Sequence, residues 1–284
     1  MKTSEIFKDK TVLSFEIFPS DNDEQTNETL DMLSQLQPDF ISVTNSTSST
    51  KNQGKTFQLA SEIKNKYGIE GVAHLPCINI SEEDVLHILD NLEKNGIENL
   101  LALRGDISDN TVFKGRFHHA NELIAFIRER YDFNIIAACY PEAHPESKNI
   151  IDDINKLKLK ADSGASQLIT QIFLDNNYFY NFRERASIAG INIPIEAGIM
   201  PVTNKKQIER MVKLCGISLP KKFLKIIERY ENSPASLRDA GIAYAVNQIV
   251  DLVSQGTEGI HLYTMNNPYV AKKISEAVST IIKI

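Results

Sequence analysis

Eight short apolar runs alternate with amphipathic segments along almost the whole of this 284-residue chain, and this alternation limits the folds open to it. The runs are rich in β-branched residues and about five to seven residues long, which is typical of strands buried on both faces. They are Val12–Phe18, Phe40–Thr44, Gly71–Leu75, Asn99–Leu103, Ile135–Cys139, Leu168–Phe173, Ile193–Ala197 and Gly259–Tyr263. Strands that alternate with helices predict a parallel sheet.

The segments between these runs carry helical periodicity and the signals of helix ends. Ser81 precedes three acidic residues, which predicts an N-cap with acids in the first turn, and Gly96 stands where a left-handed C-cap is expected. We expect helices over Glu24–Leu36, Phe57–Lys66, Ser81–Asn95, Ile150–Ser163 and Tyr178–Ala189. Three further segments separate the seventh and eighth strands, and we interpret them as one barrel helix plus an insertion: Lys205–Gly216, Pro220–Tyr230 and Ser236–Gly256.

Eight repeats of one strand–helix unit favour a closed (β/α)8 barrel over an open doubly wound sheet. Such barrels commonly need about 250 residues, close to the length of this chain. The G-x-G-x-x-G dinucleotide fingerprint is absent, and no linker rich in proline, glycine or serine divides the chain. We therefore expect one barrel domain over residues 1–284.

Composition excludes several classes of protein. A net charge of −6 gives no basis for broad attraction to nucleic acid or anionic lipid. Three cysteines without C-x-x-C spacing argue against a disulfide framework and a zinc site. The polar N-terminus has no signal core, and no run approaches the roughly 18 apolar residues of a membrane span. We expect a cytoplasmic protein.

Glu16 is a carboxylate within an otherwise apolar and aromatic first strand. Catalytic residues of such barrels lie at the C-terminal ends of the strands, where Glu16 stands. Burial raises the pKa of a carboxyl group, which would suit a general acid near neutral pH. A structural glutamate bonded to a neighbouring strand explains the same position equally well.

Other strand ends carry polar residues that suit a ligand. His74 and His144 lack the paired spacing of metal ligands, so we expect hydrogen bonds to a polar ligand and no metal. The remaining histidines, including His261, are interpreted as surface, loop or packing residues. Arg104-Gly105-Asp106 combines a cation, a flexible backbone and a carboxylate, which suits an anionic or heteroaromatic ligand.

Gln171, at the end of the sixth strand, offers a donor and an acceptor in one plane. That pattern matches the amide-like edge of a pterin or purine, although a core amide satisfied by backbone is the alternative. No G-x-S-x-G elbow or Walker loop supports acyl or phosphoryl transfer. The residues alone therefore predict acid–base chemistry on a polar heteroaromatic ligand.

Seven strings at the strand ends follow the order typical of one family. The chain resembles bacterial methylenetetrahydrofolate reductases from about residue 11 to its C-terminus. The strings are residues 14–19 (SFEIFP), 43–44 (VT), 73–75 (AHL), 103–106 (LRGD), 140–146 (YPEAHPE), 169–171 (ITQ) and 261–264 (HLYT). The first, fourth and fifth together are highly specific.

The resemblance implies a (β/α)8 barrel that holds FAD non-covalently at its C-terminal face. NADH or NADPH would reduce the flavin and leave, and 5,10-methylenetetrahydrofolate would replace it in ping-pong fashion. The product would be 5-methyltetrahydrofolate, which feeds methionine synthesis. The resemblance further implies a homo-oligomer, and we expect no regulatory domain.

Matching positions imply a role for each site residue. Glu16 would be the general acid that protonates folate N10 as the ring opens, and Asp106 would stabilise the cationic iminium that accepts hydride. Gln171 would orient the folate. The remaining substrate positions are Gln207, a weaker candidate, and Tyr263, which would pack in the site. The FAD-contacting positions are Thr44, His74, Arg104, Gly105, Asp106, Tyr140, His144, Asp153, Lys156 and Lys160.

Three positions depart from the family pattern. Asn267 stands where an arginine can meet the folate tail, Lys156 replaces an asparagine, and Met211 replaces an aromatic residue that can stack on a ligand. Two other functions stay open. One is a flavin-free barrel that binds a pterin or folate and transfers one-carbon units, and the other is a non-catalytic flavin- or folate-binding subunit.

Overall fold

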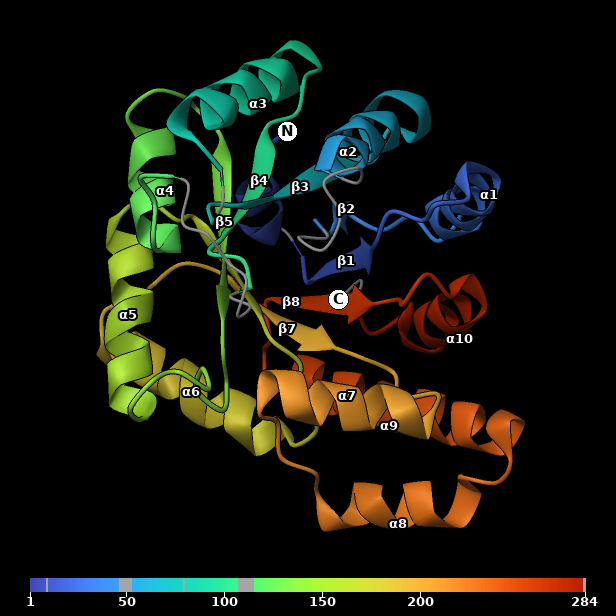
Figure 1. Cartoon of the computed structure of the whole chain (residues 1–284). Coiled ribbons are helices and arrows are strands. Elements are labelled where there is room, and N and C mark those ends of the chain that lie inside the picture. The colour runs from blue at the N-terminus through green and yellow to red at the C-terminus, as the bar shows by residue number, and fades with distance from the viewer. Residues whose placement is uncertain (9, 46–52, 79, 107–114, 283–284) are drawn as a thin grey trace.

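Eight parallel strands form a closed barrel in the computed structural model, which describes residues 1–8, 10–45, 53–78, 80–106 and 115–282. Each strand pairs with the next along the chain, and β8 pairs with β1 (Figure 1). The strands are β1 Val12–Ile17, β2 Phe40–Val43, β3 Glu70–Pro76, β4 Asn99–Leu103, β5 Asn134–Cys139, β6 Gln167–Thr170, β7 Ile195–Ile199 and β8 Gly259–Tyr263. The predicted (β/α)8 barrel is confirmed.

Helices follow the strands and surround the barrel (Figure 1). They are α1 Asp23–Ser34, α2 Gln53–Tyr67, α3 Glu82–Lys94, α4 Ala120–Arg128, α5 Ile150–Asp162, α6 Asn176–Ile188, α7 Lys205–Cys215, α8 Lys221–Tyr230, α9 Pro234–Ser254 and α10 Pro268–Val278, with a 3-10 helix η1 at Thr3–Lys8. The three segments expected before β8 are α7, α8 and α9, and α8 lies farthest from the strands (Figure 1). No helix in the described part of the chain is long and apolar enough to cross a membrane.

The two predicted end signals of α3 are both present in the structure. The Ser81 hydroxyl accepts a hydrogen bond from the backbone N–H of Asp84 at 3.1 Å, which satisfies one free donor of the first turn of α3. Gly96 follows this helix with φ of +75°. Glycine adopts this left-handed conformation without strain because it has no Cβ. Ser81 thus fixes the start of α3, and Gly96 ends it three residues before β4 begins at Asn99.

Two strands, β6 and β7, depart from their predicted limits by two residues or more at one end or both. Strand β7 begins at Ile195 and not Ile193, because Pro194 has no backbone N–H to donate to a neighbouring strand. Strand β6 ends at Thr170, so Gln171 is the first residue beyond it. Gln171 thus stands at the rim of the barrel and not within its wall.

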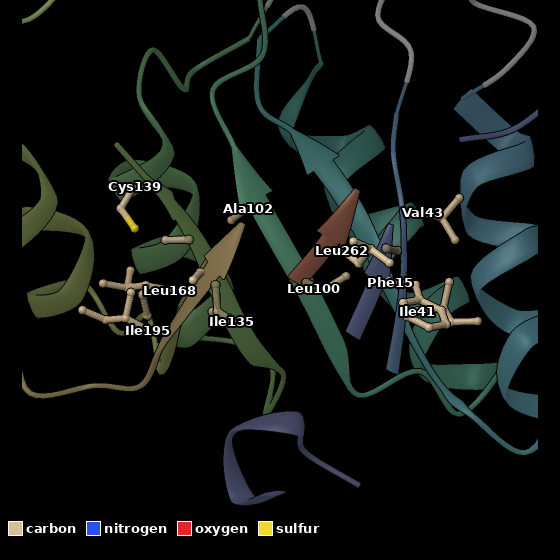
Figure 2. Packing of buried hydrophobic residues seen from close by; sticks show 14 of the residues in the cluster. Phe15, Ile41, Val43, Leu100, Ala102, Ile135, Cys139, Leu168, Ile195 and Leu262 are labelled. Carbon is tan, nitrogen blue, oxygen red and sulfur yellow. The ribbon is translucent and has the colours of Figure 1, made fainter. Parts of the chain in front are cut away.

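The main hydrophobic core fills the space between the barrel and its helices. Figure 2 labels ten of its members, among them Phe15, Leu100 and Leu262 on three different strands. A second cluster lies inside the barrel and is built from side chains of alternate strand positions: Val12, Phe40, Val72, Leu101, Ile136 and Ile169.

A buried polar cluster shares the interior with these apolar side chains. Ser14, Gln167, Glu196 and His261 have no exposed surface, and hydrogen bonds link them in the order His261, Ser14, Glu196, Gln167. The interpretation of His261 as a packing histidine is therefore incomplete, because its ring nitrogens face polar partners. Glu196 lies within the predicted strand Ile193–Ala197, and the sequence alone did not lead us to single it out.

The contact of β3 with α2 depends on Gly71. A Cβ at this position would stand 2.2 Å from the backbone oxygen of Ala60, so Gly71→Ala requires a backbone shift. We expect a loss of about 1–3 kcal/mol in the free energy of unfolding, measured by urea denaturation. The control is Gly54→Ala on α2, where a Cβ meets nothing within 4 Å. Equal effects of the two changes would contradict the proposed contact.

Candidate active site

A cavity of about 720 Å³ opens at the C-terminal ends of the strands. Every strand contributes to its wall at or just beyond its end, and α5 supplies one side. The predicted site residues on this wall are Glu16, Thr44, His74, Arg104, Gly105, Asp106, Tyr140, His144, Asp153, Lys156, Lys160, Gln171 and Tyr263. Among the described residues, Gln207 is the predicted site residue that lies off this wall.

Glu16 lies deep in the cavity between two histidines. Its carboxylate Oε2 is 3.8 Å from Nε2 of His74 and 3.9 Å from Nε2 of His261, and a fifth of its side chain is exposed. Burial lowers the pKa of His74 to about 4, so this imidazole is neutral at pH 7. Glu16 and His74 therefore do not form an ion pair at that pH.

Two buried polar atoms on or beside the cavity wall have no partner among the described residues. They are Nε2 of His74 and Oδ1 of Asn45, a residue that the sequence analysis missed. An unpaired buried polar atom costs about 1–3 kcal/mol, which a ligand hydrogen bond would offset. Both atoms thus indicate a polar ligand over β2 and β3.

Tyr263 closes the cavity on the β6–β8 side. Its hydroxyl donates to the backbone oxygen of Thr170 at 2.7 Å, and burial raises its pKa. The ring fits because the intervening strand β7 carries Gly198, where a Cβ would stand 2.7 Å from a Tyr263 ring carbon. The glycine therefore positions the tyrosine.

Arg104 lies beyond β4 and is held by Glu146 in a bidentate ion pair with N···O distances of 2.5 and 2.8 Å. This pairing lowers the pKa of Glu146. Gly105 follows with φ of +92°, and a Cβ there would stand 2.7 Å from the Ile78 side chain. The turn thus keeps the backbone next to the cavity, with the exposed Asp106 at its rim.

Side chains on α5 and the loop before it form a second polar group. Asp153 accepts hydrogen bonds from the backbone N–H of His144 at 3.2 Å and from the Ser147 hydroxyl at 2.8 Å. Lys160 donates to the backbone oxygen of Ala138 at 2.8 Å, and burial lowers its pKa. Lys156 pairs with Asp152 at 2.8 Å.

The ring of Tyr140 meets that of His144 edge to face, with centroids 4.6 Å apart. Burial is the main cause of the lowered pKa of His144 and of the raised pKa of Tyr140. Both rings thus stay uncharged near neutral pH, and they give this side of the cavity an uncharged wall beside the cations of α5.

The opposite wall is largely apolar. Met200, Met211 and Met265 line it beside Gln171, whose side-chain oxygen accepts a hydrogen bond from the backbone N–H of Ile172 at 2.8 Å. Gln207 lies in the first turn of α7, and its side-chain oxygen is 3.4 Å from the backbone nitrogen of Thr203. Flexible methionine side chains adapt to flat ring systems.

The site therefore combines cations on one side, an apolar wall on the other and a carboxyl group on the floor. In the described part of the chain, no group of three or more His, Cys, Asp or Glu side chains could hold a metal ion. Arg104, Lys156 and Lys160 suit phosphate groups, whereas the methionines suit planar rings. This arrangement fits a large anionic cofactor with an aromatic ring system.

Comparison with solved structures supports the barrel fold. A protein of Clostridium thermocellum, described as binding two copies of 5-methyl-5,6,7,8-tetrahydrofolic acid, matches with a TM-score of 0.63 at 14% identity, over 100% of both chains. A Yersinia pestis DHPS with a pterine-sulfa conjugate matches with a TM-score of 0.52 at 11% identity, over 99% of this chain and 95% of that one. At these identities the likeness concerns the fold alone.

Comparison of sequences is more specific. The family model described as methylenetetrahydrofolate reductase matches residues 2–279. The 5,10-methylenetetrahydrofolate reductase of Buchnera aphidicola subsp. Baizongia pistaciae is 35% identical over 97% of this chain and 92% of its own, and that of Pectobacterium carotovorum is 34% identical over 89% and 85%. "Methylenetetrahydrofolate reductase (NADH) 1" of Arabidopsis thaliana is 34% identical over 90% of this chain and 46% of its own. The chain belongs to the methylenetetrahydrofolate reductase family of enzymes.

Proposed function

We propose that this enzyme reduces 5,10-methylenetetrahydrofolate to 5-methyltetrahydrofolate with NADH or NADPH, through FAD bound in the cavity. The observation that carries the proposal is Glu16, a carboxyl group on the floor of a cavity that has cations on one side and methionines on the other. The product would feed methionine synthesis. Because one cavity serves both reactants, the nicotinamide and the folate would bind in turn, as in a ping-pong mechanism.

The residues present fit FAD. Arg104, Lys156 and Lys160 would meet its phosphates, with Arg104 exchanging Glu146 for a phosphate oxygen. The unpaired Nε2 of His74 offers a polar contact from the floor, and Thr44, Gly105, Tyr140, His144 and Asp153 complete the proposed wall. When bound, FAD supplies a hydride acceptor for the nicotinamide and a hydride donor for the folate.

The chain's own groups would then handle the proton and the developing charge. Glu16 donates a proton to folate N10 as the five-membered ring opens, and Asp106 at the rim stabilises the positive charge on the folate. Gln171 presents its amide to the pterin edge, with Gln207 from α7 as a second candidate. Tyr263 packs against the bound ring system.

The purified enzyme should be yellow, with a flavin absorption band that bleaches on anaerobic addition of NADH or NADPH. Each nicotinamide is titrated separately, and the faster reductant identifies the physiological donor. Steady oxidation of that donor with menadione as the acceptor checks turnover of the flavin alone. A colourless protein that still binds folate would instead favour a flavin-free barrel that transfers one-carbon units.

Glu16→Gln should separate the two half-reactions. We expect reduction by the nicotinamide within about twofold of wild type, since that step needs no proton from Glu16. Transfer to the folate should fall by about 10²–10⁴-fold, the usual contribution of a general acid. Stopped-flow absorbance measures both rates. Equal losses in the two half-reactions, with flavin still bound, would rule out Glu16 as the acid.

Lys160→Met should weaken FAD binding about tenfold or more, because it removes a charge-assisted contact of about 1.5–3 kcal/mol. Lys158→Met is the matched control on the same helix, since Lys158 pairs with Asp162 and does not line the cavity. Fluorescence titration of the apoprotein with FAD gives both dissociation constants. Similar constants for the two variants would remove Lys160 from the phosphate site.

A further inference from the structure

We propose that Glu196 stores the proton that Glu16 delivers to the folate, and that Ser14 and His261 carry it between them. The inference rests on the proposed function of Glu16. It adds to that function a positioning residue, Glu196, on the opposite side of the barrel interior from the substrate. Glu196 acts only through its neighbours and touches no reactant.

Hydrogen bonds join Glu196, Ser14 and His261, and a short gap separates His261 from Glu16. Ser14 Oγ is 2.5 Å from Oε2 of Glu196 and 2.6 Å from Nδ1 of His261. On the other side of the ring, Nε2 of His261 is 3.4 Å from Oγ of Ser42 and 3.9 Å from Oε2 of Glu16. This last distance exceeds a hydrogen bond by about 1 Å, and a small rotation of Glu16 would close it, as catalytic hydrogen bonds often tighten in a complex.

The series is isolated from solvent at its lower end. Ser14, Glu196 and His261 have no exposed surface, whereas Glu16 is exposed only in part and lines the cavity. A cofactor and a folate stacked over the mouth would cover Glu16. A proton that Glu16 does not already hold when it is covered must then come from a group inside the barrel.

The transfer balances without an additional reactant. Glu196 gives its proton to Ser14 Oγ, the Ser14 hydroxyl proton passes to Nδ1 of His261, and the Nε2 proton passes to Glu16, which protonates folate N10. Glu196 ends as a carboxylate that accepts from Ser14, and His261 ends with its proton on Nδ1. When the cavity opens, Glu16 takes a proton from water and the same steps in reverse reload Glu196.

The surroundings of Glu196 suit a proton store. Burial raises the pKa of Glu196 to about 7, whereas His261 and the hydrogen bonds from Ser14 and Gln167 lower it, and Asp39 raises it. Gln167 on β6 is neutral. On the other side of His261, the titratable neighbours are Glu16, the neutral His74 and Tyr263, whose ring meets that of His261 edge to face. Near pH 7 the store is therefore poised to give up its proton.

A purely structural role would make Glu196 part of a polar plug at the bottom of the barrel. Gln167 continues the network downward, where its side-chain oxygen accepts from the Thr3 hydroxyl at 2.7 Å, and that hydroxyl accepts from Asn134 at 2.8 Å. If the network serves only packing, disturbing it above or below Gln167 should have similar effects. A variant that disturbs the network below Gln167, at Thr3, is therefore the matched control.

The test compares Glu196→Gln with Thr3→Val in the flavin-loaded enzyme. The amide introduced by Glu196→Gln can still hydrogen bond to Ser14 and Gln167 but holds no transferable proton, and Thr3→Val removes the hydrogen bond to Gln167. In single-turnover oxidation by the folate, we expect Glu196→Gln to lower the rate about tenfold or more with an unchanged folate dissociation constant. It should also abolish the fall in rate that wild type shows as the pH rises through about 7. Thr3→Val should keep both the rate and the pH profile.

A second readout does not depend on folate turnover. In protein labelled with ¹⁵N-histidine, the His261 ring signals of wild type and Thr3→Val should change tautomer near pH 7, whereas Glu196→Gln should hold one tautomer. A His261 tautomer change that persists near pH 7 in Glu196→Gln, or equal rate losses in the two variants, would overturn the proton store. Absence of folate reduction in wild type with the tautomer change intact would instead refute the proposed function.

Discussion

The pairing of β8 with β1 is the constraint on which the site depends. It closes the barrel, and its register sets Glu16 opposite Tyr263 and Ser14 opposite His261. Residues almost 250 positions apart thus meet at fixed depths, with Glu16 and Tyr263 facing the cavity and Ser14 and His261 in the buried interior. A slip of one residue would turn every side chain of β1 to the other face.

Burial sets the pKa values of the groups around the cavity floor. His74 is uncharged beside Glu16, and burial raises the pKa of Glu196, a carboxyl group with no exposed surface. Cations collect on the opposite wall, where Arg104 is satisfied by Glu146 and Lys160 by a backbone oxygen. The cavity therefore separates a side that carries Arg104, Lys156 and Lys160 from a floor formed by Glu16 and the neutral His74.

Much of this could be predicted from the sequence, because buried parallel strands leave near-continuous apolar runs and because barrel chemistry collects at strand ends. Eight strands, the insertion before β8 and the position of Glu16 follow from those two regularities. The start of β7 was predicted two residues too early. Pro194 has no backbone N–H to donate, and a pattern of hydrophobicity does not reveal this. The helices α4 and α10 were not delimited.

The rest depended on pairs that only folding brings together. Glu196 meets Ser14 across 182 positions, and the apolar run in which it stands does not identify this partner. Only the structure identifies Asn45 and Glu146 as site residues. Asn45 has a buried side-chain oxygen without a partner, and Glu146 forms a bidentate ion pair with Arg104. Gln207, in contrast, was placed by resemblance and lies beside the cavity wall and not on it.

The central claim is that Glu16 faces the reacting nitrogen of the folate. A crystal structure of the oxidised enzyme with 5-methyltetrahydrofolate measures this directly. The account predicts the Glu16 carboxyl within about 2.6–3.2 Å of folate N10, or joined to it by one water. A folate bound with N10 turned away from β1, and Glu16 bonded only to protein, would contradict it.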